Sequence, residues 1–229
     1  MSGAVSLLET VQALLERTYR MRTGLSEVGR FVIGDEGYRR LYRDLEIVTT
    51  AGTAPGEKIG ARTLVRETPE GIRACIYYPD DLIRCLESHP PQRGLREANV
   101  DAFAALVEEL DHLLCIAERA RDDRPLTLLE LELHANVSKH LVLARFLSAP
   151  GRPLDERRRV WLSYQLFHKG TFRDEDVDAR ARYRDAARFA LRLLETLMRL
   201  PPAGRIEILR RFHAATASAK LELILGLAA

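Results

Sequence analysis

The strongest constraint on the fold is the helical spacing of apolar residues from Asn99 to the C-terminus. Apolar side chains recur there at intervals of three and four residues, the pattern of amphipathic helices packed on a core. Proline-containing segments interrupt the pattern at R-D-D-R-P, Pro150-Gly-Arg-Pro153 and Pro201-Pro202. The capping box Thr127-x-x-Glu130 marks one helix start. The spacing predicts helices over roughly 99–120, 127–148, 154–168, 174–199 and 203–226.

The first hundred residues have a mixed character. We predict an amphipathic helix over 5–22, a short extended stretch at 31–33, one or two helical turns at 38–43 and a β-rich segment at 45–50. Two β-type runs, 58–67 and 71–78, are joined by T-P-E-G and predict a β-hairpin, and a short helix follows at 80–87. The predicted class is α+β: an N-terminal helix, a small antiparallel sheet with a β-hairpin, then a predominantly helical C-terminal half. We divide it into residues 1–150 and a helical subdomain, 151–229, packed on them, with one continuous domain as the alternative.

Composition excludes several classes of protein. Hydrophobic residues make up 46% and charged residues 30%, as in soluble globular proteins, and a net charge of +2 gives no bulk attraction for nucleic acid or an anionic membrane. No apolar run is long enough to span a bilayer, and the N-terminus lacks a signal-peptide pattern. The three cysteines are widely spaced, which favours reduced thiols. We expect a cytoplasmic protein, from a bacterium because arginine greatly exceeds lysine.

The predicted helix 99–120 carries polar side chains on an unusual second face. At about 100° per residue, the core stripe is centred on Phe103 and Leu110, and Glu108, His112 and Glu109 fall at about 140°, 180° and 240° from Phe103. Small and apolar residues share this second face: Ala104, Ala105, Cys115 and Ile116. Such a face is typical of the lining of a cleft.

The next helix is apolar on nearly all sides, and Glu132 lies on its apolar side. A carboxylate in that position is costly unless it is paired, protonated or bound to a metal. Asn136 and His140 follow one and two turns later, and an ion pair with Lys139 or an arginine is the alternative to a metal. A narrow polar strip on the opposite side contains Glu130, His134, Ser138 and Arg145.

The segment Glu108-Glu109-Leu110-Asp111-His112, with Glu132 20 residues further on, resembles the motif of the gluzincin class of metallopeptidases. That motif is H-E-x-x-H followed by a downstream glutamate. The resemblance covers roughly residues 57–148. It implies a zincin-like fold in which the hairpin's edge strand lies beside a cleft, and hydrolysis of peptide or related amide bonds by a metal-activated water.

By this resemblance, each polar residue has a role. Glu108, His112 and Glu132 would be the metal ligands and Glu109 the catalytic general base, with Asn136 as a polar group behind the ligands. We predict the same supporting position behind the ligands for His140, because it follows Asn136 on the same side of the helix. The expected ion is zinc, and the expected partner is a peptide or protein substrate.

The departure from the motif is its first residue, which is Glu108 where the class has histidine. Two carboxylates and one imidazole make a harder and more negative site, which suits Mn or Fe at least as well as Zn. The competing hypothesis is therefore a degenerate, non-catalytic relative that has no metal and acts as a helical interaction or scaffold protein. A third is a helical adaptor unrelated to zincins. An exposed apolar stripe around Leu221–Leu227 would favour a homodimer.

Other motifs are weaker. Glu109-x-x-His112 matches half of a di-iron bundle site, but the next helix offers Glu130-x-x-x-His134, which has the wrong spacing. The segment 52–58, G-T-A-P-G-E-K, departs from a phosphate-binding loop and is better explained as a connecting loop. Three arginines at 157–159 stand near aromatic residues, and a basic helix start explains them better than nucleic-acid binding.

Overall fold

The computed structural model describes residues 6–43, 60–148, 154–169 and 177–227. In the N-terminal half the elements are α1 (Leu7–Tyr19), η1 (Val28–Phe31), β1 (Val32–Ile33), α2 (Asp35–Arg43), β2 (Arg62–Thr68), β3 (Gly71–Tyr77), α3 (Asp80–Ser88) and η2 (Pro91–Arg93). They are followed by α4 (Val100–Arg121), α5 (Leu128–Leu147), α6 (Glu156–Ser163), the π-helical turn η3 (Tyr164–His168), α7 (Val177–Arg199), α8 (Pro202–Ala214) and α9 (Ala217–Gly226). The predicted α+β class, with its N-terminal helix and helical C-terminal half, is confirmed.

The sheet has three described strands in the order β1-β3-β2. β2 and β3 form the predicted antiparallel hairpin, and Gly71 closes its turn at a φ of 128° that side chains rarely adopt. β1 runs parallel to β3, so the sheet is mixed and the prediction of an antiparallel sheet holds only for the hairpin. Parallel pairing needs a long connection, which the chain between β1 and β2 supplies. The predicted β-rich segment 45–50 and the loop 52–58 lie outside the described residues.

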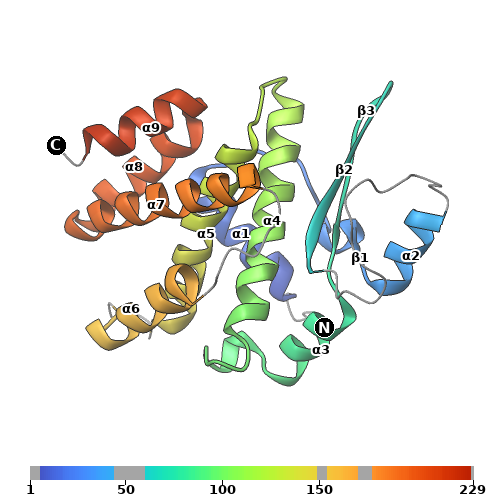
Figure 1. The fold of residues 1–229 in the computed structure, drawn as a ribbon, viewed down its shortest axis with the longest axis horizontal. Helices are drawn as coiled ribbons and strands as arrows, with labels where there is room; N and C mark the ends of the chain where they lie inside the picture. Colours follow the sequence, from blue (N-terminus) through green and yellow to red (C-terminus); the bar gives the residue numbers. More distant parts are fainter. Residues whose placement is uncertain (1–5, 44–59, 149–153, 170–176, 228–229) are drawn as a thin grey trace.

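The helix α4 is the centre of the molecule. In Figure 1 it stands between the sheet and the helices α5 to α9; it packs on β2 and β3, and on its other side against α1 and α5. α5 in turn packs along α7. Large side chains with almost no exposure fill these contacts: Tyr19, Tyr78, Phe103, Leu110, Leu114, Leu133 and Leu143. The core stripe predicted for residues 99–120 is therefore buried, with Phe103, Leu110 and Leu114 among its residues.

The start of α5 is the capping box that the sequence predicts. The Thr127 hydroxyl accepts a hydrogen bond from the Glu130 N–H at 3.2 Å, and the Glu130 carboxylate accepts one from the Thr127 N–H at 3.1 Å. The same carboxylate accepts a hydrogen bond from the buried Lys220 ammonium of α9, at 3.0 Å. The cap therefore ties the beginning of α5 to the C-terminal helix.

The prediction of one helix over 203–226 is wrong, because the chain breaks between α8 and α9. No proline or glycine marks the break. Instead, Arg119 donates to the carbonyl oxygens of His213 and Ala215 at 3.2 and 3.3 Å, and Lys220 donates to that of Ala215 at 3.0 Å. Arg124 donates to the carbonyl of Ala214 at 2.8 Å. These side chains satisfy the carbonyl groups that the end of a helix leaves free.

The C-terminal helix α9 buries most of its apolar side. Ile224 is buried, and Leu221, Leu223 and Leu227 pack partly against the core. Leu225 is 46% exposed. The continuous exposed stripe that would argue for a homodimer is thus reduced to one side chain. No described helix is both long and apolar enough to cross a membrane.

Replacing Thr127 with alanine tests the α5 cap. The change removes the hydroxyl that accepts the Glu130 N–H, so we expect the free energy of unfolding to fall by about 1 kcal/mol in chemical denaturation. Thr216→Ala is the matched control, because Thr216 is also an exposed N-cap threonine but its hydroxyl contacts the Ser218 hydroxyl at 3.4 Å and caps no backbone N–H of α9. Equal losses in the two variants would contradict the capping interpretation.

Candidate metal site between two helices

Glu108, His112 and Glu132 converge between α4 and α5. Glu108 and His112 are one turn apart on α4, where residues four apart share a face. Glu132 comes from the second turn of α5, which packs beside α4. One ligand atom from each residue lies within 4.8 Å of the others. The structure therefore brings together the three residues that the sequence singled out as metal ligands.

Glu108 already has a cationic partner. The Lys139 ammonium donates a hydrogen bond to Glu108 Oε2 at 2.9 Å. Burial by itself raises the pKa of Glu108, but Lys139 and then His112 outweigh it and hold the pKa below its usual 4.5. Lys139 thus pairs with Glu108, and not with Glu132 as the alternative for that residue assumed.

Glu132 is a buried carboxyl group that carries an oxygen, Oε2, with no partner in the described part of the chain. Its side chain is part of a residue only 8% exposed, and its Oε2 has no hydrogen-bond partner among the described residues. Burial raises the pKa of Glu132 to about 7, partly offset by His112 and increased again by Glu108. The group is therefore half ionised near neutral pH.

Among the described residues, His112 has a side-chain partner at one of its two ring nitrogens. Its Nδ1 lies 3.5 Å from Glu109 Oε2, while its Nε2 is buried and has no hydrogen-bond partner among the described residues. Burial lowers the pKa of His112, but Glu109, and then Glu108 and Glu132, outweigh it and raise the pKa to about 9. Without another cation, the ring is protonated at neutral pH.

Glu109 connects the sheet to this site. Thr63 of β2 donates its hydroxyl to Glu109 Oε2 at 2.8 Å and also approaches the Glu109 carbonyl at 3.1 Å. The carboxylate therefore lies at the Nδ1 side of His112, where it orients the ring. Its role as general base stays a prediction.

Asn136 and His140, predicted to support the metal ligands, make different contacts on α5. The Asn136 amide donates to the main-chain oxygen of Glu132 at 2.9 Å, one turn back along α5. The ring of His140, whose pKa burial lowers to about 4, faces Phe167 with 6.4 Å between ring centroids. Two turns separate His140 from Glu132, about 12 Å along the axis. Supporting roles for both residues stay predictions.

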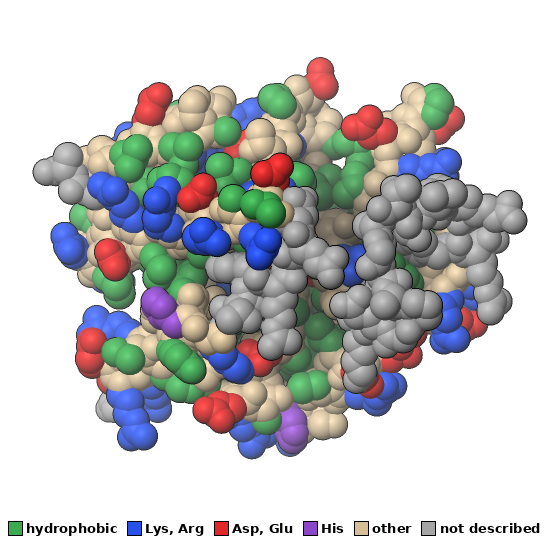
Figure 2. Space-filling model, viewed as in Figure 1, with side chains coloured by type: hydrophobic (Ala, Val, Ile, Leu, Met, Phe, Trp, Pro, Cys, Tyr) green, Lys and Arg blue, Asp and Glu red, His purple; other side chains and the backbone are tan. Residues whose placement is uncertain are grey.

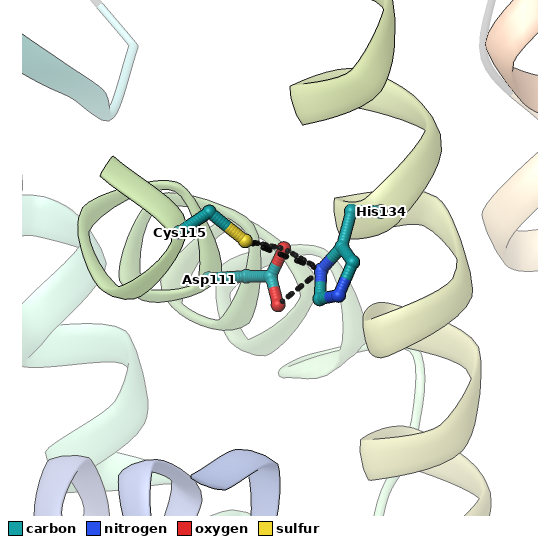
Figure 3. Close-up of side chains that lie close together, drawn as sticks. All are labelled: Asp111, Cys115 and His134. Atoms are coloured by element: carbon teal, nitrogen blue, oxygen red, sulfur yellow. Dashed lines mark hydrogen bonds and ion pairs between the residues drawn. The ribbon is translucent and has the colours of Figure 1, made fainter. Parts of the chain in front are cut away.

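A second cluster that the sequence analysis missed lies on the other side of the α4–α5 contact. Figure 3 shows Asp111, Cys115 and His134 pointing toward one another. His134 Nδ1 is 2.8 Å from Asp111 Oδ2 and 3.4 Å from Cys115 Sγ, and all three residues are buried. Burial raises the pKa of the Cys115 thiol well above its usual value, and Asp111 adds to the effect.

This cluster continues outward through a second histidine. His134 Nε2 lies 3.1 Å from His213 Nδ1 of α8, and His213 Nε2 lies 2.6 Å from Glu118 Oε2 on α4. Burial lowers the pKa of His134 in spite of Asp111, which favours the neutral ring. The row Asp111–His134–His213–Glu118 thus joins three helices.

One sequence signal could have revealed the second cluster. Glu130, His134 and Ser138 recur every four residues on α5, a spacing that predicts a polar strip, yet all three are buried. Asp111 falls at about 80° from Phe103, next to the core stripe of α4. An acid beside the core of one helix and a polar row on its neighbour indicate a buried polar contact.

The second cluster is not arranged for nucleophilic catalysis. In a catalytic triad, the acid and the nucleophile contact opposite ring nitrogens. Here Cys115 and Asp111 both contact Nδ1 of His134, and the thiol is buried. The arrangement suits hydrogen bonding or metal ligation, because both place donor atoms around one point.

The basic surface over α7 is separate from both clusters. Figure 2 shows Lys and Arg side chains gathered on this face. A groove of about 590 Å³ runs along it between α7 and η3, lined by Phe167, Leu191 and four arginines, with Glu195 as its one carboxylate. None of the predicted site residues lines it, so it does not alter the assignment of the candidate site.

Comparison with known proteins gives no relative to carry the argument further: no family model, curated protein or solved structure matches this chain. The class that the fold defines is an α+β protein with a central helix. Its two metal-type side-chain groups, among the described residues, are Glu108–His112–Glu132 and Asp111–Cys115–His134.

The row of buried hydrogen bonds predicts a dependence of stability on acid pH. Burial raises the pKa of Glu118, but the hydrogen bonds from His213 and the Arg22 N–H outweigh it and lower the pKa from 4.5 to about 2. A carboxyl group with a lowered pKa stabilises the fold fully above about pH 4.5, and this contribution is lost as the pH falls towards 2.

We therefore expect Glu118→Gln to reduce the pH dependence of the unfolding free energy between pH 4.5 and 2, measured by urea denaturation. Glu222→Gln, on an exposed position of α9, is the matched control and should retain the wild-type slope. A wild-type slope in Glu118→Gln would contradict the assignment.

Proposed function

We propose that this protein is a metal-dependent hydrolase of peptide or related amide bonds, with the ion held by Glu108, His112 and Glu132. The observation that supports it is the pair of buried ligand atoms, His112 Nε2 and Glu132 Oε2, without hydrogen-bond partners among the described residues. Buried polar atoms in native proteins are nearly always paired. A cation bound between them would pair both.

The donor set agrees with a transition metal. Ligand bonds to zinc are about 2.0–2.2 Å for histidine and carboxylate, so ligand atoms around a tetrahedral ion lie roughly 3.3–3.6 Å apart. The three donor atoms lie within 4.8 Å of one another, so small side-chain movements would close them around an ion. One imidazole and two carboxylates suit Zn, and equally Mn or Fe.

The neighbouring residues prepare the site for hydrolysis. An ion of this class, when bound, polarises a carbonyl group and activates a water molecule. Glu109 holds Nδ1 of His112, which leaves Nε2 as the nitrogen available to a ligand. Thr63 restrains one oxygen of Glu109, so the general-base role requires the other oxygen or the release of Thr63.

The sheet supports a peptide as the substrate class. β2 is an edge strand of the described sheet, and its Thr63 contacts Glu109 beside the cluster. An extended peptide can add to an exposed strand edge through main-chain hydrogen bonds. A peptide on this edge would run past the cluster. We infer a cytoplasmic enzyme without nucleic-acid or membrane partners.

The alternative is a non-catalytic helical scaffold, a relative without metal that binds a protein partner or a second copy of itself. The Lys139–Glu108 ion pair favours it, because an ammonium already neutralises the first carboxylate. Protons on His112 and Glu132, whose pKa values are raised to about 9 and about 7, would balance the remaining charges.

Metal analysis separates the two proposals. The protein, purified without chelator, is compared with the double variant His112→Ala/Glu132→Ala by elemental mass spectrometry. We expect the double variant to bind one ion fewer per chain and to lose amide hydrolysis. His89→Ala, which removes a half-buried histidine at the end of α3, outside the cluster, should retain the wild-type metal content. Equal metal content in wild type and double variant would exclude the enzyme.

Replacing Lys139 with methionine gives a second test. The change leaves the Glu108 carboxylate unpaired, so we expect a loss of about 1–3 kcal/mol in unfolding free energy without added metal. Added zinc should restore the stability, because the ion takes the place of the ammonium. Lys169→Met, which breaks an exposed pair with Asp101, should cost less than about 1 kcal/mol and show no rescue. The scaffold alternative predicts no rescue by zinc in either variant.

A further inference from the structure

We propose that Asp111, Cys115 and His134 form a second metal site, buried and structural, which holds a zinc ion independently of the first. One ligand atom of each residue lies within 4.8 Å of the others. Asp111 and Cys115 are one turn apart on α4, and His134 faces them from α5 (Figure 3). Two helices that pack on each other therefore hold the three ligands in place.

The distances between the donor atoms are close to those around a tetrahedral ion. With bonds of about 2.0–2.3 Å, ligand atoms around zinc lie roughly 3.3–3.6 Å apart. Cys115 Sγ lies 3.4 Å from His134 Nδ1 and 3.9 Å from Asp111 Oδ2. The third separation, 2.8 Å between Asp111 Oδ2 and His134 Nδ1, must widen by about half an ångström.

The donor set selects zinc over harder ions. A thiolate and an imidazole favour zinc, whereas magnesium and calcium prefer all-oxygen sites. The two negative charges of Asp111 and the Cys115 thiolate would balance a divalent ion, so the buried site would be neutral overall. The hydroxyl of Ser138, 3.5 Å from His134 Nδ1 and hydrogen-bonded to Tyr19 at 2.9 Å, is the oxygen placed to complete the coordination.

The hydrogen bonds around His134 support an ion on Nδ1. Asp111, His134, His213 and Glu118 are joined by three hydrogen bonds in a row, each of which needs one hydrogen. Two neutral imidazole rings supply two hydrogens and ionised carboxylates supply none. Without an ion, the row therefore needs one additional proton, which places a positive charge on a pair of buried rings.

An ion on Nδ1 of His134 removes this difficulty. It replaces the hydrogen bond to Asp111, so the two neutral rings satisfy the two bonds that remain. His134 then donates from Nε2 to His213, and His213 donates to Glu118. A ligating histidine commonly donates its other N–H in this way to a group that fixes its orientation.

Burial separates the roles of the two sites. The Glu108 side chain is 26% exposed, so the first site has access to solvent, as a catalytic site needs. Asp111, Cys115 and His134 are buried, which is typical of closed structural sites. Through His213 the second ion would hold α8 as well as α4 and α5.

The test detects a bond between zinc and sulfur, because the second site has the Cys115 thiol as a ligand and the first site has nitrogen and oxygen ligands alone. Zinc-loaded His112→Ala/Glu132→Ala protein, which lacks the first site, is examined by zinc X-ray absorption. We expect one Zn–S distance of about 2.3 Å together with nitrogen or oxygen neighbours at about 2.0–2.1 Å. This measurement leaves Asp111, Cys115 and His134 intact, so it does not depend on the folding of a variant at the second site.

A matched pair of cysteine variants completes the test. In the same background, Cys115→Ser should lose the Zn–S signal and one zinc ion per chain, whereas Cys75→Ser on β3 should retain both. An absent sulfur signal, or a signal unchanged in Cys115→Ser, would overturn the second site. The outcome is separate from the proposed function, since wild-type zinc with only nitrogen and oxygen neighbours would leave the first site standing alone.

Discussion

The structure depends on the packing of α4 against α5, which removes several ionisable side chains from most of their contact with water. Burial of a charged group is costly unless a partner compensates it. Each acid or base in this contact therefore needs a hydrogen bond, an opposite charge or an ion. Most of them have one among the described residues: Glu108 has Lys139, Glu130 has Lys220, and Asp111 has His134.

The two clusters differ in how well this requirement is met. Around Asp111, Cys115 and His134, each converging atom has a neighbour within hydrogen-bond range. The row of hydrogen bonds that begins there needs one positive charge more than two neutral histidine rings carry. Around Glu108, His112 and Glu132, two buried atoms lack hydrogen-bond partners within the part of the chain that the structure describes. At the Glu108–His112–Glu132 site a cation would contact two buried atoms that have no other partner among the described residues. At the Asp111–Cys115–His134 site it would supply the positive charge that the hydrogen-bonded row needs.

The same polar contacts shape the C-terminal part of the chain. Arg119 and Lys220 flank Glu130 and donate to the carbonyl groups at the end of α8. They hold the break before α9 at a position where the local sequence has no helix-breaking residue. His213, which lies at that helix end, is thereby placed against His134.

Local patterns in the sequence are enough to predict the α+β class, the hairpin and the boundaries of α4 and α5 to within a residue or two, because these follow from periodicity, capping and turn chemistry. The grouping of Glu108, His112 and Glu132 is predicted by the resemblance to the gluzincin motif, and the cost of a carboxylate on an apolar helix face supports it for Glu132. Four features emerge only in the folded protein: the parallel pairing of β1, the break between α8 and α9, the pairing of Lys139 with Glu108, and the cluster around His134. Each of these depends on contacts between residues far apart in the chain, whose free energy no local pattern contains.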